Sequence, residues 1–204
     1  MSRKINWILA AITLWIGAFG VQAAGADPQA LVQETADQVL EQVTEHKEKL
    51  TKDPSGIYAL VESLVLPHFD FMRMSQSALG RYWRDASDDQ RQRLAREFQE
   101  LLVRTYAVAL LNYSGQKIEY MPVRLQPDAQ DVTIPTRVAA AGGPPVPINY
   151  RLARDGELWK VYDVVIDGVS MVSNYRSSFA NEVRRAGIDG LIQQLADRNK
   201  QLRG

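Results

Sequence analysis

The residues that could do chemistry in this chain are few and far apart. There is no cysteine, and the two histidines are His46 and His68. His46 follows Glu45 on the polar side of an expected helix, where a solvated role is the ordinary one, and His68 follows Pro67 in an apolar stretch, which favours a structural role. The chain therefore offers no usual transition-metal cage, since such cages draw on clustered Cys and His.

Motifs of nucleophilic and nucleotide chemistry are also missing from the sequence. No H-E-x-x-H, P-loop or G-x-S-x-G string occurs, and Gly168–Val172 lacks the second glycine of a nucleophile elbow. One catalytic alternative stays open: Asp70 or Asp163, placed in apolar surroundings, could act as a base with a raised pKa. Neither has an evident partner set, so we expect no enzyme and no cofactor.

The charge balance argues against nucleic acid as a partner. Lys and Arg total 24 and Asp and Glu total 24; without Arg3 and Lys4 the basic count falls to 22. Nucleic-acid binding rests on many basic contacts to phosphate, for which such a chain has no overall drive. Two groups of arginines are interpreted first as solvated helix faces, with docking to an acidic partner or to anionic lipid headgroups as the alternative. The first group is Arg81, Arg84, Arg91, Arg93 and Arg96. The second group is Arg176, Arg184 and Arg185.

The first residues have the pattern of an export signal. Arg3 and Lys4 precede an uncharged apolar run from Trp7 to Val21, and small residues follow it. This pattern is typical of a secretory signal peptide, so we expect residues 1–23 to be cleaved and residues 24–204 to form one domain. The alternative is an uncleaved anchor, although the run is shorter than the ~20 residues that span a bilayer.

The elements that must position any site are helical at both ends of the mature chain. Apolar residues recur at helical spacing, and Ser87 with Gln90 has the spacing of a capping box. The expected helices are Asp27 to Leu50, Asp53 to Pro67, Asp88 to Tyr113, Val169 to Arg185, and Leu191 to Leu202. The run Tyr106–Leu111 has no polar face, so we expect that helix end to be buried on every side.

Strand patterns fill the middle of the chain. β-Branched and aromatic residues alternate between turn signals, and Asp155-Gly156 is a hairpin signal. The expected strands are Lys117–Met121, Asp131–Ile134, Val146–Arg154 and Leu158–Val165. Helices, then an antiparallel meander, then helices again predict an α+β domain with helices packed on one face of a curved sheet.

Two blocks of this sequence resemble one family. The block from Trp159 to Phe179 strongly resembles the signature of the MlaC family, the toluene-tolerance auxiliary component. A second block matches in Phe69-Asp70-Phe71, Ala78–Trp83, Gln90, Phe98 and Leu101–Tyr106. The resemblance spans essentially the whole mature chain in order.

The resemblance implies a fold and a function. The fold would be a cone like nuclear transport factor 2, with a curved antiparallel sheet of about four strands and helices enclosing an apolar cavity. The function would be that of a periplasmic phospholipid carrier, expected as a monomer, which maintains outer-membrane lipid asymmetry. It would shuttle glycerophospholipids between an outer-membrane lipoprotein–porin complex and an inner-membrane ABC transporter complex, with the acyl tails inside the cavity.

The candidate lipid-binding residues are apolar or aromatic side chains expected to face that cavity. Plain core packing is the alternative for each of them. A periplasmic enzyme of the same cone fold, acting on an apolar small molecule, and an interaction module with a filled core are the alternatives for the whole chain. The candidates are Phe71, Met72, Met74, Leu102, Tyr106, Leu110, Tyr150, Val164, Ile166, Val169, Met171 and Tyr175.

Overall fold

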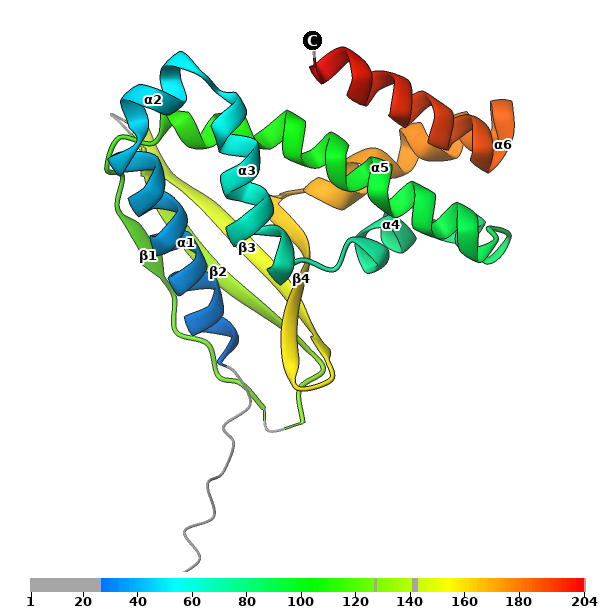
Figure 1. Ribbon diagram of the computed structural model, residues 1–204. Coiled ribbons are helices and arrows are strands. Elements are labelled where there is room, and N and C mark those ends of the chain that lie inside the picture. The colour runs from blue at the N-terminus through cyan, green and yellow to red at the C-terminus, as the bar shows by residue number, and fades with distance from the viewer. Residues whose placement is uncertain (1–26, 127, 141–142, 204) are drawn as a thin grey trace, which may run out of the picture.

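The computed structural model describes residues 27–126, 128–140 and 143–203, so the expected signal peptide lies outside the described residues. A curved antiparallel sheet and a layer of helices make up the fold, as Figure 1 shows. The helices are α1 (Pro28–Glu45), α2 (Lys47–Lys52), α3 (Ser55–Leu64), α4 (Phe71–Leu79), α5 (Asp88–Tyr106) and α6 (Met171–Arg203), with short 3₁₀ turns η1 (Leu66–His68), η2 (Gly80–Arg84) and η3 (Ala107–Asn112). The strands are β1 (Ile118–Tyr120), β2 (Asp131–Ala140), β3 (Gly143–Asp155), β4 (Leu158–Ile166) and β5 (Val169–Ser170).

The sheet is a meander in the order β1-β2-β3-β4-β5, which confirms the α+β class. The Asp155-Gly156 hairpin is confirmed as well, because Asp155 pairs with Leu158 and Gly156 takes a positive φ of 62°. The sequence predicted about four strands, and the sheet of the described residues has five. Asp167 (φ 49°) and Gly168 (φ 80°) reverse the chain, so Val169–Ser170 pairs with β4 before the last helix begins.

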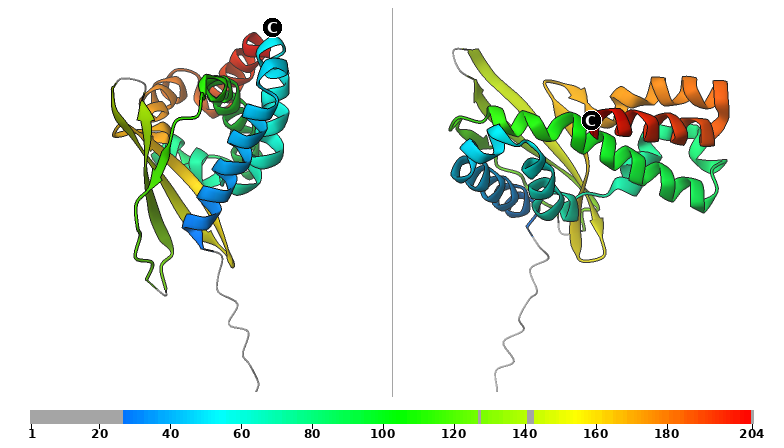
Figure 2. Two further views of the ribbon diagram at one scale, coloured as in Figure 1. Left: turned by 90° about the vertical axis from the view of Figure 1, so that its left-hand side faces the viewer. Right: turned by 45° about the horizontal axis from the view of Figure 1, so that its top comes forward.

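The register places an apolar surface on one face of the sheet. Ile134 lies opposite Tyr150 and Tyr150 opposite Val164, while Ile148 lies opposite Ile166. Because side chains alternate across a strand, these residues share one face. Figure 2 shows that the helices lie on the concave side of the sheet, with α1 running across it. The opposite face carries Thr133, Arg137 and Arg151, all exposed.

The helices begin largely where the sequence predicts. Asp27 caps α1 by accepting from the Gln29 amide at 3.0 Å, and the Ser87–Gln90 capping box of α5 is present. The first helix breaks at His46 instead of continuing to Leu50.

The prediction that Tyr106–Leu111 is buried on every side is wrong. The chain tightens to the 3₁₀ turn η3 after Tyr106, and Val108 is 41% exposed. With three residues per turn, Ala107 and Leu110 fall on the same side; they and Leu111 pack against α1 and α3, whereas Val108 and Ala109 are exposed.

Helices α4, α5 and α6 pack on one another and on β4, forming an arm that extends to one side of the sheet (Figure 1). The helix α4 was not predicted; Asp70 caps it by accepting from the Arg73 amide at 2.9 Å. The two predicted C-terminal helices are both present within α6, and the non-helical Gly187 (φ 74°, ψ −179°) separates them. The bend folds the second half of α6 back along α5.

Candidate functional site

The apolar interior is divided among three clusters. One fills the arm between α4, α5 and α6, a second joins the concave face of the sheet to α1, and a third joins α1 and α3 to η3. A domain usually has one contiguous core with smaller satellites. Here half-buried apolar side chains lie at the margins of the clusters, and Met171 and Phe69 touch two clusters each. The apolar interior of the described residues is therefore not one contiguous packed core.

Tyr150, at the centre of the concave face, shows the interior most directly. Burial raises the pKa of the Tyr150 phenol, so the side chain is deep in the protein. The residue nevertheless keeps accessible surface, whereas its neighbours Ile134 and Leu152 keep none. Tyr150 thus combines a deeply placed phenol with some accessible surface.

Tyr120 lies on the same face, at the edge strand β1. Burial, with contributions from Asp37 and Tyr150, raises the pKa of the Tyr120 phenol to about 12. Its hydroxyl is buried and has no hydrogen-bond partner within the described ranges. Buried hydroxyls without a hydrogen-bond partner are uncommon in folded proteins.

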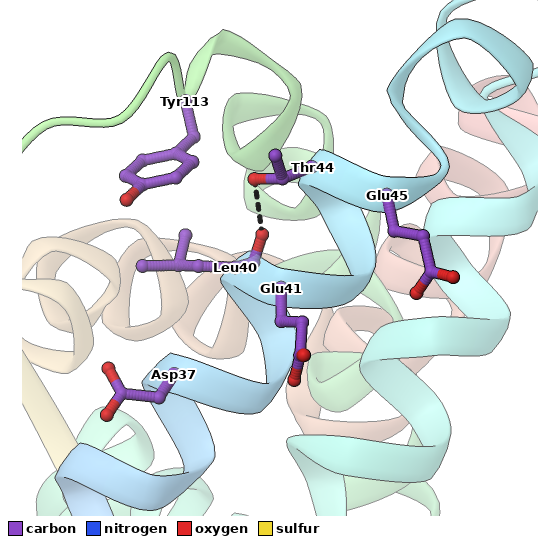
Figure 3. Close-up of a pocket in the computed structure, with 6 residues that line it drawn as sticks. All are labelled: Asp37, Leu40, Glu41, Thr44, Glu45 and Tyr113. Carbon is purple, nitrogen blue, oxygen red and sulfur yellow. Dashed lines mark hydrogen bonds between the residues drawn. The ribbon is translucent and has the colours of Figure 1, made fainter.

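An open groove of about 570 Å³ lies on the outer side of α1 (Figure 3). Leu40 and the Tyr113 ring form its apolar part, while the carboxylates of Asp37, Glu41 and Glu45 form its rim. The Thr44 hydroxyl turns back to the Leu40 carbonyl at 2.7 Å. Because Asp37 also acts on Tyr120, the groove lies over the seam between α1 and β1.

A second groove, of about 650 Å³, lies between α4, α5 and the β3–β4 hairpin. Phe71 and Met72 line it together with charged and amide side chains, among them Arg96 and Lys160. Phe71 stacks on Phe69 at 5.9 Å. The candidates Phe71 and Met72 thus border a mixed groove that faces outward, and Phe71 also packs on the arm cluster.

The structure brings most of the candidate residues together in the first two clusters. Tyr150, Val164 and Met171 belong to the sheet cluster, and Leu110 to the α1–α3 cluster. Three candidates lie outside all clusters and are exposed: Met72 (42%), Ile166 (37%) and Val169 (60%). The arm cluster contains Phe71, Met74, Leu102, Tyr106, Met171 and Tyr175, of which Met74 (0%) and Leu102 (5%) have almost no free surface.

Sequence reasoning missed apolar residues of the concave face. Ile148, Val132 and Tyr120 border the sheet cluster, and none was a candidate. The alternation of apolar and polar residues along β2 and β3 carried the signal. The choice of face required the register, which the sequence alone did not supply.

The titratable residues singled out from the sequence have structural partners. Asp163 accepts from the Ser170 hydroxyl at 2.7 Å, the Val172 amide at 3.2 Å and Arg151 at 3.2 Å. Its neighbour Val164 faces the interior, so Asp163 faces the other side. Asp70 is the cap of α4. Burial, followed by the charge of Lys160, lowers the pKa of His68, which is not fully buried.

Neither a metal site nor a membrane span is found in the part of the chain that the structure describes. Among those residues, no group of three or more His, Cys, Asp or Glu side chains is placed to hold a metal ion. No helix of the same ranges combines the length and the hydropathy needed to cross a bilayer.

Comparison with known proteins identifies the family of this chain. The sequence model of the MlaC protein family matches residues 33–197. The chain belongs to the MlaC family. It is 30% identical over 175 residues to the intermembrane phospholipid transport system binding protein MlaC of Haemophilus influenzae, covering 84% of this chain and 82% of that one. It is 28% identical over 190 residues to toluene tolerance protein ttg2D of Pseudomonas putida, covering 93% and 85%.

A solved structure is similar over most of the fold. The phospholipid-binding protein of Ralstonia solanacearum, determined in complex with a phospholipid, is 36% identical, with a TM-score of 0.79 over 88% of this chain and 100% of that one. In this MlaC-family chain, the block from Trp159 to Phe179 forms β4, β5 and the start of α6. It therefore connects the concave face to the arm.

Proposed function

We propose that this protein is a periplasmic phospholipid carrier that holds acyl tails against the concave face of its sheet. The observation that carries the proposal is Tyr150, which is deep in the protein yet keeps free surface among apolar neighbours. The phospholipid in the related Ralstonia solanacearum structure and the name of the Haemophilus influenzae relative support it. The phospholipid is the cargo; no cofactor and no catalytic role are proposed.

The proposal includes export and delivery. Residues 1–23 are proposed as a cleaved signal peptide that directs the chain, as a monomer, to the periplasm. Loading and release are proposed to occur at an outer-membrane lipoprotein–porin complex and at an inner-membrane ABC transporter complex. The transport role in the relative's name supports such partners.

The proposed lining consists of candidates that keep free surface near the concave face. Tyr106, Leu110, Tyr150, Ile166 and Met171 are only partly buried or exposed. Val164 and the newly identified Ile148 complete the sheet side. Met74 and Leu102 are proposed to support this lining from behind, because nearly all of their surface is already in contact with protein.

The free energy of burying two acyl tails indicates that the partner complexes control lipid transfer. Burying one methylene contributes about 0.8 kcal/mol, so two tails with ~30 methylenes gain more than about 20 kcal/mol relative to water. Non-covalent affinities reach their ceiling near that value. The tails therefore do not leave into bulk water, whereas movement into another apolar medium costs little. We expect the purified protein to keep its phospholipid through dialysis.

The test places a charge on the concave face. Ile148→Glu should remove most of the bound phospholipid, because a carboxylate would be desolvated against acyl chains. Asn149→Glu, one residue along the same strand and on the opposite face, is the matched control and should keep its lipid. Native mass spectrometry with organic extraction measures lipid per chain, and circular dichroism confirms that both variants fold.

Three outcomes separate the carrier from its alternatives. Lipid lost from Ile148→Glu and kept in Asn149→Glu supports the carrier. A wild-type protein that is lipid-free and folded contradicts it and favours a filled core. Turnover of a bound small molecule would favour an enzyme of the same fold.

A further inference from the structure

The structure divides the arginines of the arm into two sets. The first set is ion-paired. Arg91 pairs with Asp88 at 3.0 Å, and Arg185 pairs with Glu182 at 2.6 Å. Arg93 pairs with both Asp89 and Asp189, at 2.6 and 2.7 Å. In residues 27–126, 128–140 and 143–203, no carboxylate lies within 4.0 Å of Arg81, Arg176 or Arg184. All three of these side chains are exposed, as are Arg84, Arg96 and Arg198 of the arm, which likewise have no carboxylate partner in the described residues. A solvated, self-neutralising face accounts for the first set only.

Arg81, Arg176 and Arg184 surround one turn. Arg81 donates to the Tyr82 hydroxyl at 2.9 Å, and its guanidinium lies 4.9 Å from the centre of the Tyr82 ring. Arg176 donates to the Ser77 carbonyl at 3.3 Å and passes beside Gly80, where an added Cβ would be 3.4 Å from its Nε. We call Arg81, Arg176 and Arg184, around Gly80–Tyr82, the arginine turn.

The Tyr82 hydroxyl lies in a positive electrostatic environment. Hydrogen bonds from Arg81 and then from Arg184 lower the pKa of the Tyr82 phenol. Arg81 donates directly to the phenol oxygen, and Arg184, which donates to the Asn181 side chain, adds its positive charge nearby. A guanidinium fork matches the planar oxygens of carboxylates and the oxygens of phosphates, so the turn is suited to an oxyanion.

The surroundings favour a protein over a membrane as the source of that oxyanion. Asp85 is exposed at the same end of the arm without the arginine partner that Asp88 and Asp89 have in the described residues, and it would repel an extended anionic bilayer. None of the exposed large apolar side chains in the described residues lies in η2 or between Met171 and Gly187, and the half-buried Tyr82 and Trp83 pack against the arm cluster. A protein partner needs only local contact with the turn.

We propose that the arginine turn docks carboxylates of an acidic protein partner. The segment between α4 and α5, which contains Gly80–Tyr82, lies toward the free end of the arm, as Figure 1 shows. Docking there orients the carrier without obstructing its cargo. This role in orientation rests on the proposed carrier function, although the binding itself does not.

The test compares two double charge reversals of equal size. The turn variant combines Arg81→Glu with Arg184→Glu and so reverses two of the three positive charges of the arginine turn. The α2 variant combines Lys49→Glu with Lys52→Glu and changes the net charge equally on the exposed face of α2. The probe is fluorescein-labelled hexaglutamate, followed by anisotropy at low salt. The turn variant should bind about tenfold more weakly or worse, and the α2 variant should stay within about twofold of wild type, because close charge pairs dominate. Arg81→Ala with Arg184→Ala should show the same loss without added repulsion.

Equal weakening in both reversals, or unchanged binding in the turn variants, would overturn the proposal. Vesicles of phosphatidylethanolamine with phosphatidylglycerol form the second arm of the test. If the turn variants lose vesicle binding but keep hexaglutamate binding, the turn is a membrane site and the protein proposal is wrong. Bound phospholipid should be unchanged in the turn variants. A lipid-free wild type would contradict the carrier function alone, and the peptide comparison would still decide docking.

Discussion

The arm and the concave face are built from similar apolar residues but packed differently. In the arm, Phe98 is fully buried and meets Tyr175 and Phe179 edge-on at 5.1 and 5.2 Å. The small side chain of Ala78 is fully buried in the same cluster. On the concave face, Tyr150 and Ile148 keep free surface although they lie under the helices. Packing, not residue type, distinguishes a filled core from a lined space.

The largest expected effect belongs to the filled core. Phe98→Ala should lower the free energy of unfolding by about 3–5 kcal/mol, because it leaves a cavity that the arm cannot collapse into. Denaturant unfolding of the lipid-free protein measures this loss. A loss below about 1 kcal/mol would show that the arm is loosely packed and would remove the contrast with the sheet.

The bend of α6 is the next most sensitive feature of the arm. Gly187→Ala should cost about 1–3 kcal/mol, because φ 74° with ψ −179° is essentially a glycine conformation. A Cβ at Gly187 would meet nothing within 4 Å, so the cost is one of backbone conformation. Gly115→Ala, at φ 87° and also in open space, is the matched control. Hydrogen exchange in Leu191 to Leu195 should rise in the first variant and stay unchanged in the second.

The concave face should respond weakly to the same kind of truncation. Ile148→Ala should cost less than about 1 kcal/mol in the lipid-free protein, because the side chain already borders free space and leaves little new cavity. Unfolding of lipid-loaded protein should show a larger loss, since tail contacts are then removed. Equal and large losses in both states would mean that Ile148 is ordinary core.

Local signals in the sequence predicted the elements well. The Asp27 cap, the Ser87–Gln90 capping box and the Asp155-Gly156 turn each act over a few residues, and all three are present. The errors arose where tertiary contacts decide. Tyr106–Leu111 is apolar throughout, yet Val108 and Ala109 are exposed in the 3₁₀ turn.

The candidate site was less predictable than the fold. Met74 and Tyr150 are both apolar or aromatic residues in apolar stretches, yet one is fully packed and the other keeps free surface. The distinction depends on how far α1 stands from the sheet and how closely α4 approaches α5. Those separations depend on contacts between residues far apart in the chain, which hydrophobic periodicity does not describe.

The smallest expected effect concerns the ion pair that ties the end of α6 to α5. Arg203 donates to both carboxylate oxygens of Glu100, at 2.6 and 2.5 Å, and Arg104 donates to the same carboxylate at 2.7 Å. The hydrogen bond from Arg203, opposed by burial and aided by Arg104, holds the pKa of Glu100 below its usual value. The Arg203 side chain is 53% exposed, so screening limits the pair to about 0.5–1 kcal/mol.

The pH dependence follows from the direction of that shift. A depressed carboxyl pKa stabilises the folded protein fully above the unfolded pKa of about 4.3, and the contribution is lost as pH falls through the folded pKa. Arg203→Ala should therefore be less stable than wild type at pH 7, and the difference should vanish at the acidic end of a denaturant series. Lys200→Ala, which removes an exposed partner of Asp197 one turn earlier, is the control and should change stability less. A difference that persists unchanged into acid would show that Arg203 acts through packing of its stem on the arm.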